Sequence, residues 1–288
     1  MSHIRIVVES GSDISPELAA KYGISVVPMH VAFDDDVRED GTFDPQEVVD
    51  FYTRTGRTPK TSGSNTEDFS RIFDQIHSED PEAGILYLAY SAATTVSYSC
   101  GVAAMEGRDY VRAVDTKMVT IGQAMIAVCM AEKLLKHPEW DLDRAKEEAE
   151  KLVKIAHVSF VPRNLDFLRA GGRCTNSTAL IGNILHIVPL IDTIDGLLVA
   201  TKKYRGRFSS VITKMMTEYT EQYHLSKDRL FIALTPGFEE TLKEVIRKTA
   251  ENLSYHNLVW LNTGGVITTH GGAGAFGIAG LSEDGVRD

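Results

Sequence analysis

The stretch Ile85-Leu-Tyr-Leu-Ala-Tyr90-Ser91-Ala-Ala-Thr-Thr-Val-Ser-Tyr-Ser99 decides how this chain folds. Its first six residues form an apolar run that is typical of a buried strand, and a helix is predicted from about residue 95 to 106. Between them lies a loop with five small hydroxyl side chains in nine residues and no charged residue. Strand, loop and helix in this order are the repeating unit of an α/β fold, so the stretch predicts a parallel sheet.

The same alternation continues on both sides of this stretch. Further strands are predicted at 4–8, 24–27, 30–33 and 110–114. A helix is predicted to open at Ser15-Pro16-Glu17, and further helices are predicted at 44–52, 65–76 and 122–135. Ser15-Pro16 is a typical helix start, with a capping hydroxyl followed by proline. We therefore expect an α/β domain over residues 1–155, with a mostly parallel sheet, flanking helices and Ser/Thr-rich loops. Ligands of such sheets bind at the carboxyl ends of the strands.

The pattern changes after about residue 155. A strand at 157–161, a short helix that Gly171-Gly172 ends, and a hairpin at 189–203 that turns at Asp195-Gly196 indicate antiparallel pairing. The remaining expected elements are helices at 179–187, 208–223 and 238–253 and strands at 230–234 and 257–261. We expect a smaller α+β domain over residues 156–288, which closes with a glycine-rich loop around His270.

Composition excludes several classes of protein. The chain has 288 residues, 43% of them hydrophobic and 24% charged, and a net charge of −10. An acidic chain is a poor nucleic-acid binder, because such binding depends on basic patches. Its three cysteines lack CxxC spacing, and we expect a cytoplasmic protein without signal peptide or membrane span.

Cofactor and metal motifs are also missing from the sequence. There is no GxxxxGK[ST] loop, and the histidines lack HxxxH or HExxH spacing. Gly272-x-Gly274-x-x-Gly277 matches the dinucleotide fingerprint only formally, because 11 residues follow it. We expect no cofactor and no metal.

Three loops rich in serine and threonine point to an anion. They cover residues 10–12, 61–64 and 91–99, and the first two combine hydroxyls with a glycine. If they converge above one sheet edge, their hydroxyls and helix-start N–H groups suit a carboxylate or a phosphate monoanion. Alternatively, each loop only caps its own helix. His270, beside glycines, is either a ligand contact or a structural residue, and both interpretations stay open.

Seven segments in order resemble the DegV family over nearly the full length of the chain. They are Glu9-Ser-Gly-Ser-Asp13, Tyr22-Gly-Ile-Ser-Val-Val-Pro28, Pro59-Lys-Thr61-Ser62, Ser91–Ser99, Leu165-x-Phe-Leu-x-x-Gly-Gly-Arg173, Lys203-Tyr-Arg205-Gly206 and His270-Gly-Gly-Ala-Gly274. Characterised members of this family are the fatty-acid-binding subunits of bacterial fatty-acid kinase. The chain departs from the family pattern at Glu9, Ala92, Val96 and Ala273.

The resemblance implies a parallel α/β domain joined to a smaller α+β domain, with one long-chain fatty acid between them. Carried over position by position, the ligand-binding residues would be Thr61, Ser62, Thr95, His270 and Gly271. The apolar tail would need a tunnel. Its candidate walls are residues 124–130 and 180–187, although both segments also suit an ordinary core.

The resemblance also implies a carrier without catalytic residues. It would present the fatty-acid carboxylate to a separate fatty-acid kinase catalytic subunit. Arg205, in the basic cluster 202–207, would contact the kinase, and this cluster also suits transient contact with a membrane surface. Alternatively, the basic cluster is only the solvated end of a hairpin and has no partner. The alternative function is a hydrolase or transferase that acts on a small carboxylate or ester through His270 and a hydroxyl.

Overall fold

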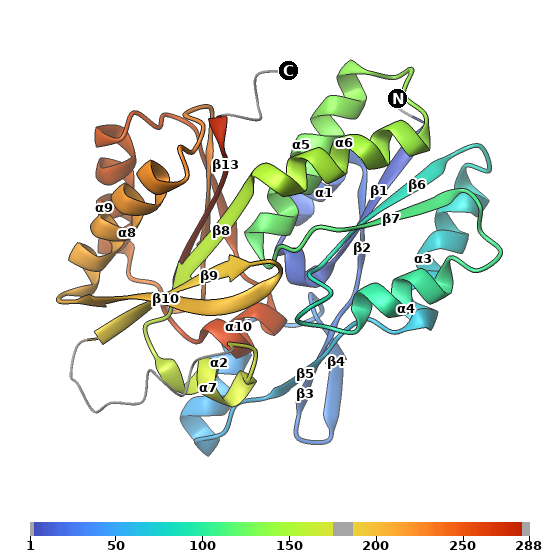
Figure 1. The fold of residues 1–288 in the computed structure, drawn as a ribbon. Helices are drawn as coiled ribbons and strands as arrows, with labels where there is room; N and C mark the ends of the chain where they lie inside the picture. Colours follow the sequence, from blue (N-terminus) through green and yellow to red (C-terminus); the bar gives the residue numbers. More distant parts are fainter. Residues whose placement is uncertain (1–2, 175–186, 284–288) are drawn as a thin grey trace.

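The computed structural model describes residues 3–174 and 187–283, and two large β-sheets organise it (Figure 1). The N-terminal sheet has four parallel strands in the order β2-β1-β6-β7. Its strands are β1 (Ile4–Glu9), β2 (Ile24–Val27), β6 (Gly84–Ala89) and β7 (Val111–Asp115). The predicted α/β fold class is therefore confirmed.

Helices cover both faces of the N-terminal sheet, as alternating strand side chains require. On β1, Ile6 and Val8 belong to the cluster that α5 completes, whereas Val7 packs with Phe69 and Phe73 of α3. Figure 1 shows α5 and α6 on one side and α3 and α4 on the other. The helices are α1 (Pro16–Tyr22), α3 (Thr66–Glu79), α4 (Ser97–Ala104), α5 (Ile121–Lys136) and α6 (Leu142–Ile155), with a 3-10 turn η1 (Ser10–Ser12) after β1.

The C-terminal sheet has six strands in the order β10-β9-β8-β13-β11-β12, and only β11 and β12 pair in parallel. Its strands are β8 (Ala156–Val161), β9 (Ile187–Ile194), β10 (Leu197–Arg205), β11 (Leu230–Leu234), β12 (Leu258–Asn262) and β13 (Phe276–Leu281). In the described part of this half, four helices accompany the sheet: α7 (Leu165–Gly171), α8 (Phe208–Gln222), α9 (Glu240–Asn252) and α10 (Gly265–Gly271).

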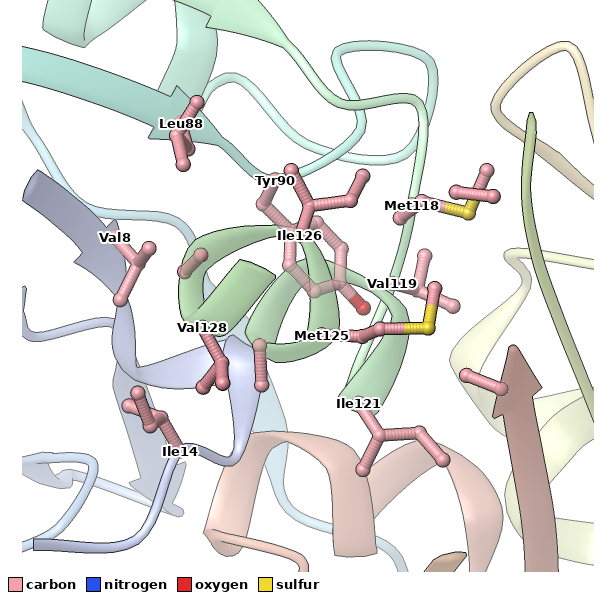
Figure 2. Close-up of a cluster of buried hydrophobic side chains, with 14 of the residues drawn as sticks. Val8, Ile14, Leu88, Tyr90, Met118, Val119, Ile121, Met125, Ile126 and Val128 are labelled. Carbon is pink, nitrogen blue, oxygen red and sulfur yellow. The ribbon is translucent and has the colours of Figure 1, made fainter. Parts of the chain in front are cut away.

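Helix α5 lies between the two sheets. Almost its whole surface is buried, and it contacts β1 on one side and β8, β11 and β13 on the other. In Figure 2, Ile121, Met125, Ile126 and Val128 of α5 point into a cluster with residues from β1 and β6. A helix that is apolar all round belongs in a protein core or a membrane. Here it is the core helix, and no helix within residues 3–174 and 187–283 is long and apolar enough to span a bilayer.

A small antiparallel sheet, in the order β4-β3-β5, was only partly predicted. It consists of β3 (His30–Phe33), β4 (Asp36–Glu39) and β5 (Lys60–Ser62), with α2 (Gln46–Thr55) between β4 and β5. The sequence analysis missed β4 and β5 because both are short and polar. Strand β5 matters most here, because it contains Thr61.

Two other predictions need correction, and two stay open. Helix α6 was not predicted, and the expected glycine-rich loop around His270 is largely helix α10. The helix expected at 179–187 falls outside the described residues, except that β9 begins at Ile187. The chain passes from α6 to β8 at residues 155–156, and the domain boundary placed there stays a prediction.

Candidate functional site

A largely apolar cavity lies where the two sheets meet the small sheet. The space that it encloses is about 840 Å³, open solvent at its mouth included. Residues from both halves of the chain line it. Its apolar lining consists of Met29, Tyr90, Val119, Phe160, Leu198, Ala233, Val266, Ile267, Ala275 and Phe276.

Thr61 and His270 form the centre of the polar lining. Thr61 is held in β5 by its pairing with Val31 of β3, and His270 is the penultimate residue of α10. The Thr61 Oγ1 and His270 Nε2 atoms lie 2.8 Å apart. Two residues 209 positions apart in the sequence thus share a hydrogen bond on the cavity wall. His270 therefore lies at the C-terminal end of its helix.

Thr95 reaches the same place from the loop after β6. A Cβ atom on Gly63 would lie 2.4 Å from the Thr95 Oγ1 atom and 2.4 Å from the Ser97 Oγ atom. The loop 61–64 therefore packs directly on hydroxyls at the start of α4. Ser97 Oγ accepts a hydrogen bond from the Ser64 N–H group (3.0 Å) and lies 3.1 Å from Thr95 Oγ1. The structure thus brings Thr61, Ser62 and Thr95 to one cavity with His270 and Gly271.

The other hydroxyls of the run 91–99 have structural partners. Ser91 donates to the Gly196 carbonyl in the turn of the β9–β10 hairpin (2.7 Å), and Ser99 donates to the Val96 carbonyl (2.8 Å). Thr94 donates to the Ser91 carbonyl (3.0 Å) and also lines the cavity. Both interpretations of the run are therefore partly right: Thr94 and Thr95 face the cavity, and the rest organise the backbone.

The expected convergence of three loops is wrong for the first loop. Ser10 donates to Asp40 (3.0 Å), and Ser12 accepts a bond from the Ile14 N–H group (3.4 Å). Neither residue is among those that line the cavity. The hydroxyls of the loop after β1 thus have structural partners, and they do not contribute to the cavity wall.

The imidazole of His270 is uncharged in this environment. Burial, reinforced by the positive charge of Arg173, lowers the pKa of His270 to about 4. Its Nδ1 atom is buried, has no hydrogen-bond partner among the described residues and faces Gly171, where a Cβ atom would lie 2.2 Å from it. His270 therefore offers hydrogen bonding at Nε2 and no positive charge.

Arg173 is a lining residue that the sequence analysis did not single out. Its side chain is exposed and donates to the Gly171 carbonyl at 3.0 Å and the Thr94 carbonyl at 3.4 Å. It is the only cation among the described lining residues. The available signal was its position at the end of the Gly171-Gly172-Arg173 segment.

One of the two segments predicted as tail walls does not line the cavity. Residues 124–130 are buried in the core around α5 and do not line the cavity. Most of 180–187 lies outside the described residues. The apolar walls come instead from strand ends and from α10, because these elements surround the space that α5 leaves open.

Arg205 lies away from the described cavity wall. It ends β10 and is exposed, as are Lys202, Lys203 and Arg207. Lys202 pairs with Glu218 of α8 (2.8 Å). The basic cluster is thus a surface feature of the hairpin.

One group within the described residues has metal-ligand types close together. Donor atoms of His30, Glu39 and Asp68 lie within 4.8 Å of one another. Arg71 lies 3.1 Å from the Glu39 carboxylate and 3.6 Å from that of Asp68. One guanidinium already pairs with both carboxylates, so the group is better described as an ion-pair network.

The cavity geometry and the order of its segments agree with one family. A model of the DegV family of uncharacterised proteins matches residues 3–283. The chain belongs to the DegV family.

Curated and solved DegV relatives extend over nearly the whole chain. A DegV domain-containing protein of Deinococcus radiodurans is 28% identical over 279 residues, 96% of this chain and 97% of its own. A fatty acid-binding protein of Thermotoga maritima is 27% identical over 282 residues, 95% of this chain and 96% of its own. A solved DegV protein of Thermus thermophilus, described for fatty acid binding, is 25% identical with a TM-score of 0.85 and covers 97% of this chain and 99% of its own.

Proposed function

We propose that this DegV protein binds one long-chain fatty acid in the cavity between residues 1–155 and 156–288, which we treat as two domains. The observation that carries the proposal is the cluster of Thr61, Thr95 and His270 on the wall of an otherwise apolar cavity. Hydroxyls and a neutral imidazole hydrogen-bond a carboxylate, and apolar walls bury an acyl chain. The Thermotoga and Thermus relatives support the same ligand class.

The acyl chain supplies most of the affinity in this proposal. Burial contributes about 0.8 kcal/mol per CH₂ group, and ordering the flexible chain offsets part of that. The head group is then held by Thr61, Thr95 and His270, with Ser62 and Gly271 beside it. Such contacts fix the orientation of the ligand without a fixed charge at the centre of the site.

We further propose that the protein is a carrier that presents the carboxylate to a separate fatty-acid kinase catalytic subunit. The exposed Arg205 in the basic hairpin surface 202–207 is the proposed kinase contact. The same surface suits brief contact with anionic lipid during exchange of the fatty acid.

The alternative function, a hydrolase or transferase that uses His270 as a base, has one observation in its favour. The 2.8 Å contact between Thr61 Oγ1 and His270 Nε2 is a nucleophile-to-base distance. However, a catalytic base needs a group that orients its second nitrogen, and Nδ1 faces Gly171 instead. A pKa of about 4 also makes His270 a weak base near neutral pH.

Native mass spectrometry of freshly purified protein, followed by lipid extraction, tests the proposal. We expect about one long-chain fatty acid per chain and no esterase turnover. An empty protein that hydrolyses nitrophenyl acetate, and loses this activity in Thr61→Val and His270→Gln, would establish the alternative instead.

A further inference from the structure

Helix α10, which places His270 in the cavity, is capped by side chains from the other half of the chain. The first N–H groups of a helix have no partner within it, and the N-cap residue Gly264 has no side chain to supply one. The Gly264 N–H group donates to Asp13 Oδ1 at 2.7 Å, and the Gly265 N–H group donates to Asp40 Oδ1 at 2.6 Å. Asp13 follows β1, and Asp40 follows β4.

The two glycines allow this close approach. A Cβ atom on Gly264 would lie 2.9 Å from Asp40 Oδ1, and one on Gly265 would lie 2.4 Å from the Phe43 ring. Both carboxylates are buried, at 6% exposure each. The contact is therefore a packed junction between the two halves of the chain.

The second oxygen of each carboxylate is tied to the cavity wall. Asp13 Oδ2 accepts from the hydroxyl of Thr120, which lines the cavity. Asp40 Oδ2 accepts from Ser10 Oγ at 3.0 Å, and Ser10 Oγ accepts from the N–H group of Met29, another lining residue, at 3.0 Å. Each carboxylate thus links one wall residue to the start of α10.

No lysine, arginine or histidine pairs with either carboxylate within the described residues. The partners are N–H groups, hydroxyls and the positive end of a helix dipole, which favours a negative charge. Burial raises the pKa of both carboxyl groups. This arrangement differs from an ion pair between side chains, because the start of helix α10 takes the place of a cationic side chain.

We infer that Asp13 and Asp40 are positioning residues for His270: they fix α10 across the junction and thereby set the Thr61–His270 contact and the head-group site. The inference rests on the proposed function for its ligand, and it adds two residues that never touch that ligand. Because Asp13 and Asp40 would act on the position of His270, their effect can be measured in the protein without fatty acid.

Variants of Asp40 test this inference in the full-length protein. Asp40→Ala removes both acceptors. We expect it to shift the imidazole ¹⁵N resonances of His270, assigned by their loss in His270→Gln, and to weaken binding of oleic acid at least tenfold. Asp40→Asn keeps an oxygen for the Gly265 N–H group, and its amide can donate to Ser10. We therefore expect Asn to restore most of both properties.

Asp192→Ala is the matched control. Asp192 is equally buried, at 4% exposure, but it lies in β9 and accepts from Thr201. We expect it to lower the melting temperature and leave the His270 resonances and oleic acid affinity unchanged. If Asp40→Ala behaves like this control, the inference is overturned.

Two further arms keep the test decisive. If Asp40→Ala does not fold, Ser10→Ala removes the donor to Asp40, together with the acceptor of the Met29 N–H group, and leaves Asp40 itself in place. We expect a smaller shift of the His270 resonances in the same direction. Unmoved resonances would then refute the inference. If the wild-type protein binds no oleic acid, the proposed function fails, whereas the resonances of the ligand-free protein still test the positioning of His270.

Discussion

At the scale of single residues, His270 governs the pH behaviour of the site. A histidine in an unfolded chain titrates near pH 6.5, whereas burial and, to a lesser degree, Arg173 lower the pKa of His270 to about 4. We expect its imidazole resonances to stay at their neutral positions from pH 8 to pH 5 and to titrate near pH 4. A midpoint above pH 6, measured by NMR, would contradict the buried geometry.

The same shift affects folding stability with a definite sign. Between pH 6.5 and 4 the unfolded chain binds a proton at His270 that the folded chain does not bind, so stability falls as pH falls through this window. His270→Gln lacks this dependence. Relative to that variant, the wild-type protein should lose up to about 1.4 kcal/mol per pH unit. Urea unfolding at pH 7, 6 and 5 measures the difference, and parallel profiles would refute it.

Thr95 offers a second test at this scale. Its hydroxyl lies on the cavity wall and also accepts the Ser97 N–H group at 3.3 Å. A hydrogen bond to a charged group contributes about 1.5–3 kcal/mol, so Thr95→Val should weaken fatty-acid binding roughly 10- to 100-fold. Loss of the bond to Ser97 should lower stability by only about 1 kcal/mol.

Thr95→Ser keeps the hydroxyl and serves as the control, with near wild-type affinity. Calorimetric binding of oleic acid and melting of the ligand-free protein separate the two effects of Thr95→Val. An unchanged affinity with a lowered melting temperature would leave Thr95 a purely structural role.

At the scale of elements, the contact between α7 and α10 is the tightest part of the site. Gly171 ends α7 against the His270 ring, and a methyl group there would overlap Nδ1. We expect Gly171→Ala to displace the ring and to weaken oleic acid binding at least tenfold.

The neighbouring Gly172→Ala variant is the control for this prediction. Gly172 has a φ of +63° with nothing within 4 Å of an added Cβ atom. It should therefore cost about 1–2 kcal/mol in backbone strain and leave affinity unchanged. If both variants lost affinity equally, the effect would come from a disturbed C-terminal end of α7 and not from the contact between Gly171 and His270.

The elements show why sequence predicts some features and not others. Ser15-Pro16 and Gly171-Gly172 are local capping signals, and the structure confirms both. Helix α10 was missed because glycine disfavours helices by about 1 kcal/mol. Its caps, Asp13 and Asp40, are more than 200 residues away, and no local pattern contains them.

The residues of the candidate site also fall into some that the sequence indicated and some that it did not. Thr61, Thr95 and His270 were implied as site residues by the resemblance to the DegV family, and the structure brings all three to one cavity. Ser97 and Arg173 were missed, because their contacts with Ser64 and Thr94 arise only from packing of separate loops. The role of Thr61, Thr95 and His270 in ligand binding remains a proposal.

At the scale of the whole molecule, the basic hairpin surface 202–207 is separate from the cavity lining. We therefore expect Arg205→Ala to leave oleic acid binding within twofold and to reduce acyl-phosphate formation by the fatty-acid kinase catalytic subunit of the same organism at least fivefold. Phosphate transfer from labelled ATP measures this. Lys146→Ala, at a partly exposed position of α6, is the control. A parallel loss of oleic acid binding would make Arg205 a structural residue.

The neutral hydroxyl wall has a consequence for selectivity among soluble anions. Sites built on lysine and arginine weaken as ionic strength rises, because salt screens the attraction. Here the polar lining has one cation, Arg173, at an exposed position, and the chain as a whole repels anions with its net charge of −10. The cavity therefore attracts acetate, phosphate and nucleotides only weakly. An increase in ionic strength should leave the affinity for a long-chain fatty acid unchanged. A protein of this design would bind its ligand through the acyl tail even among competing soluble metabolites.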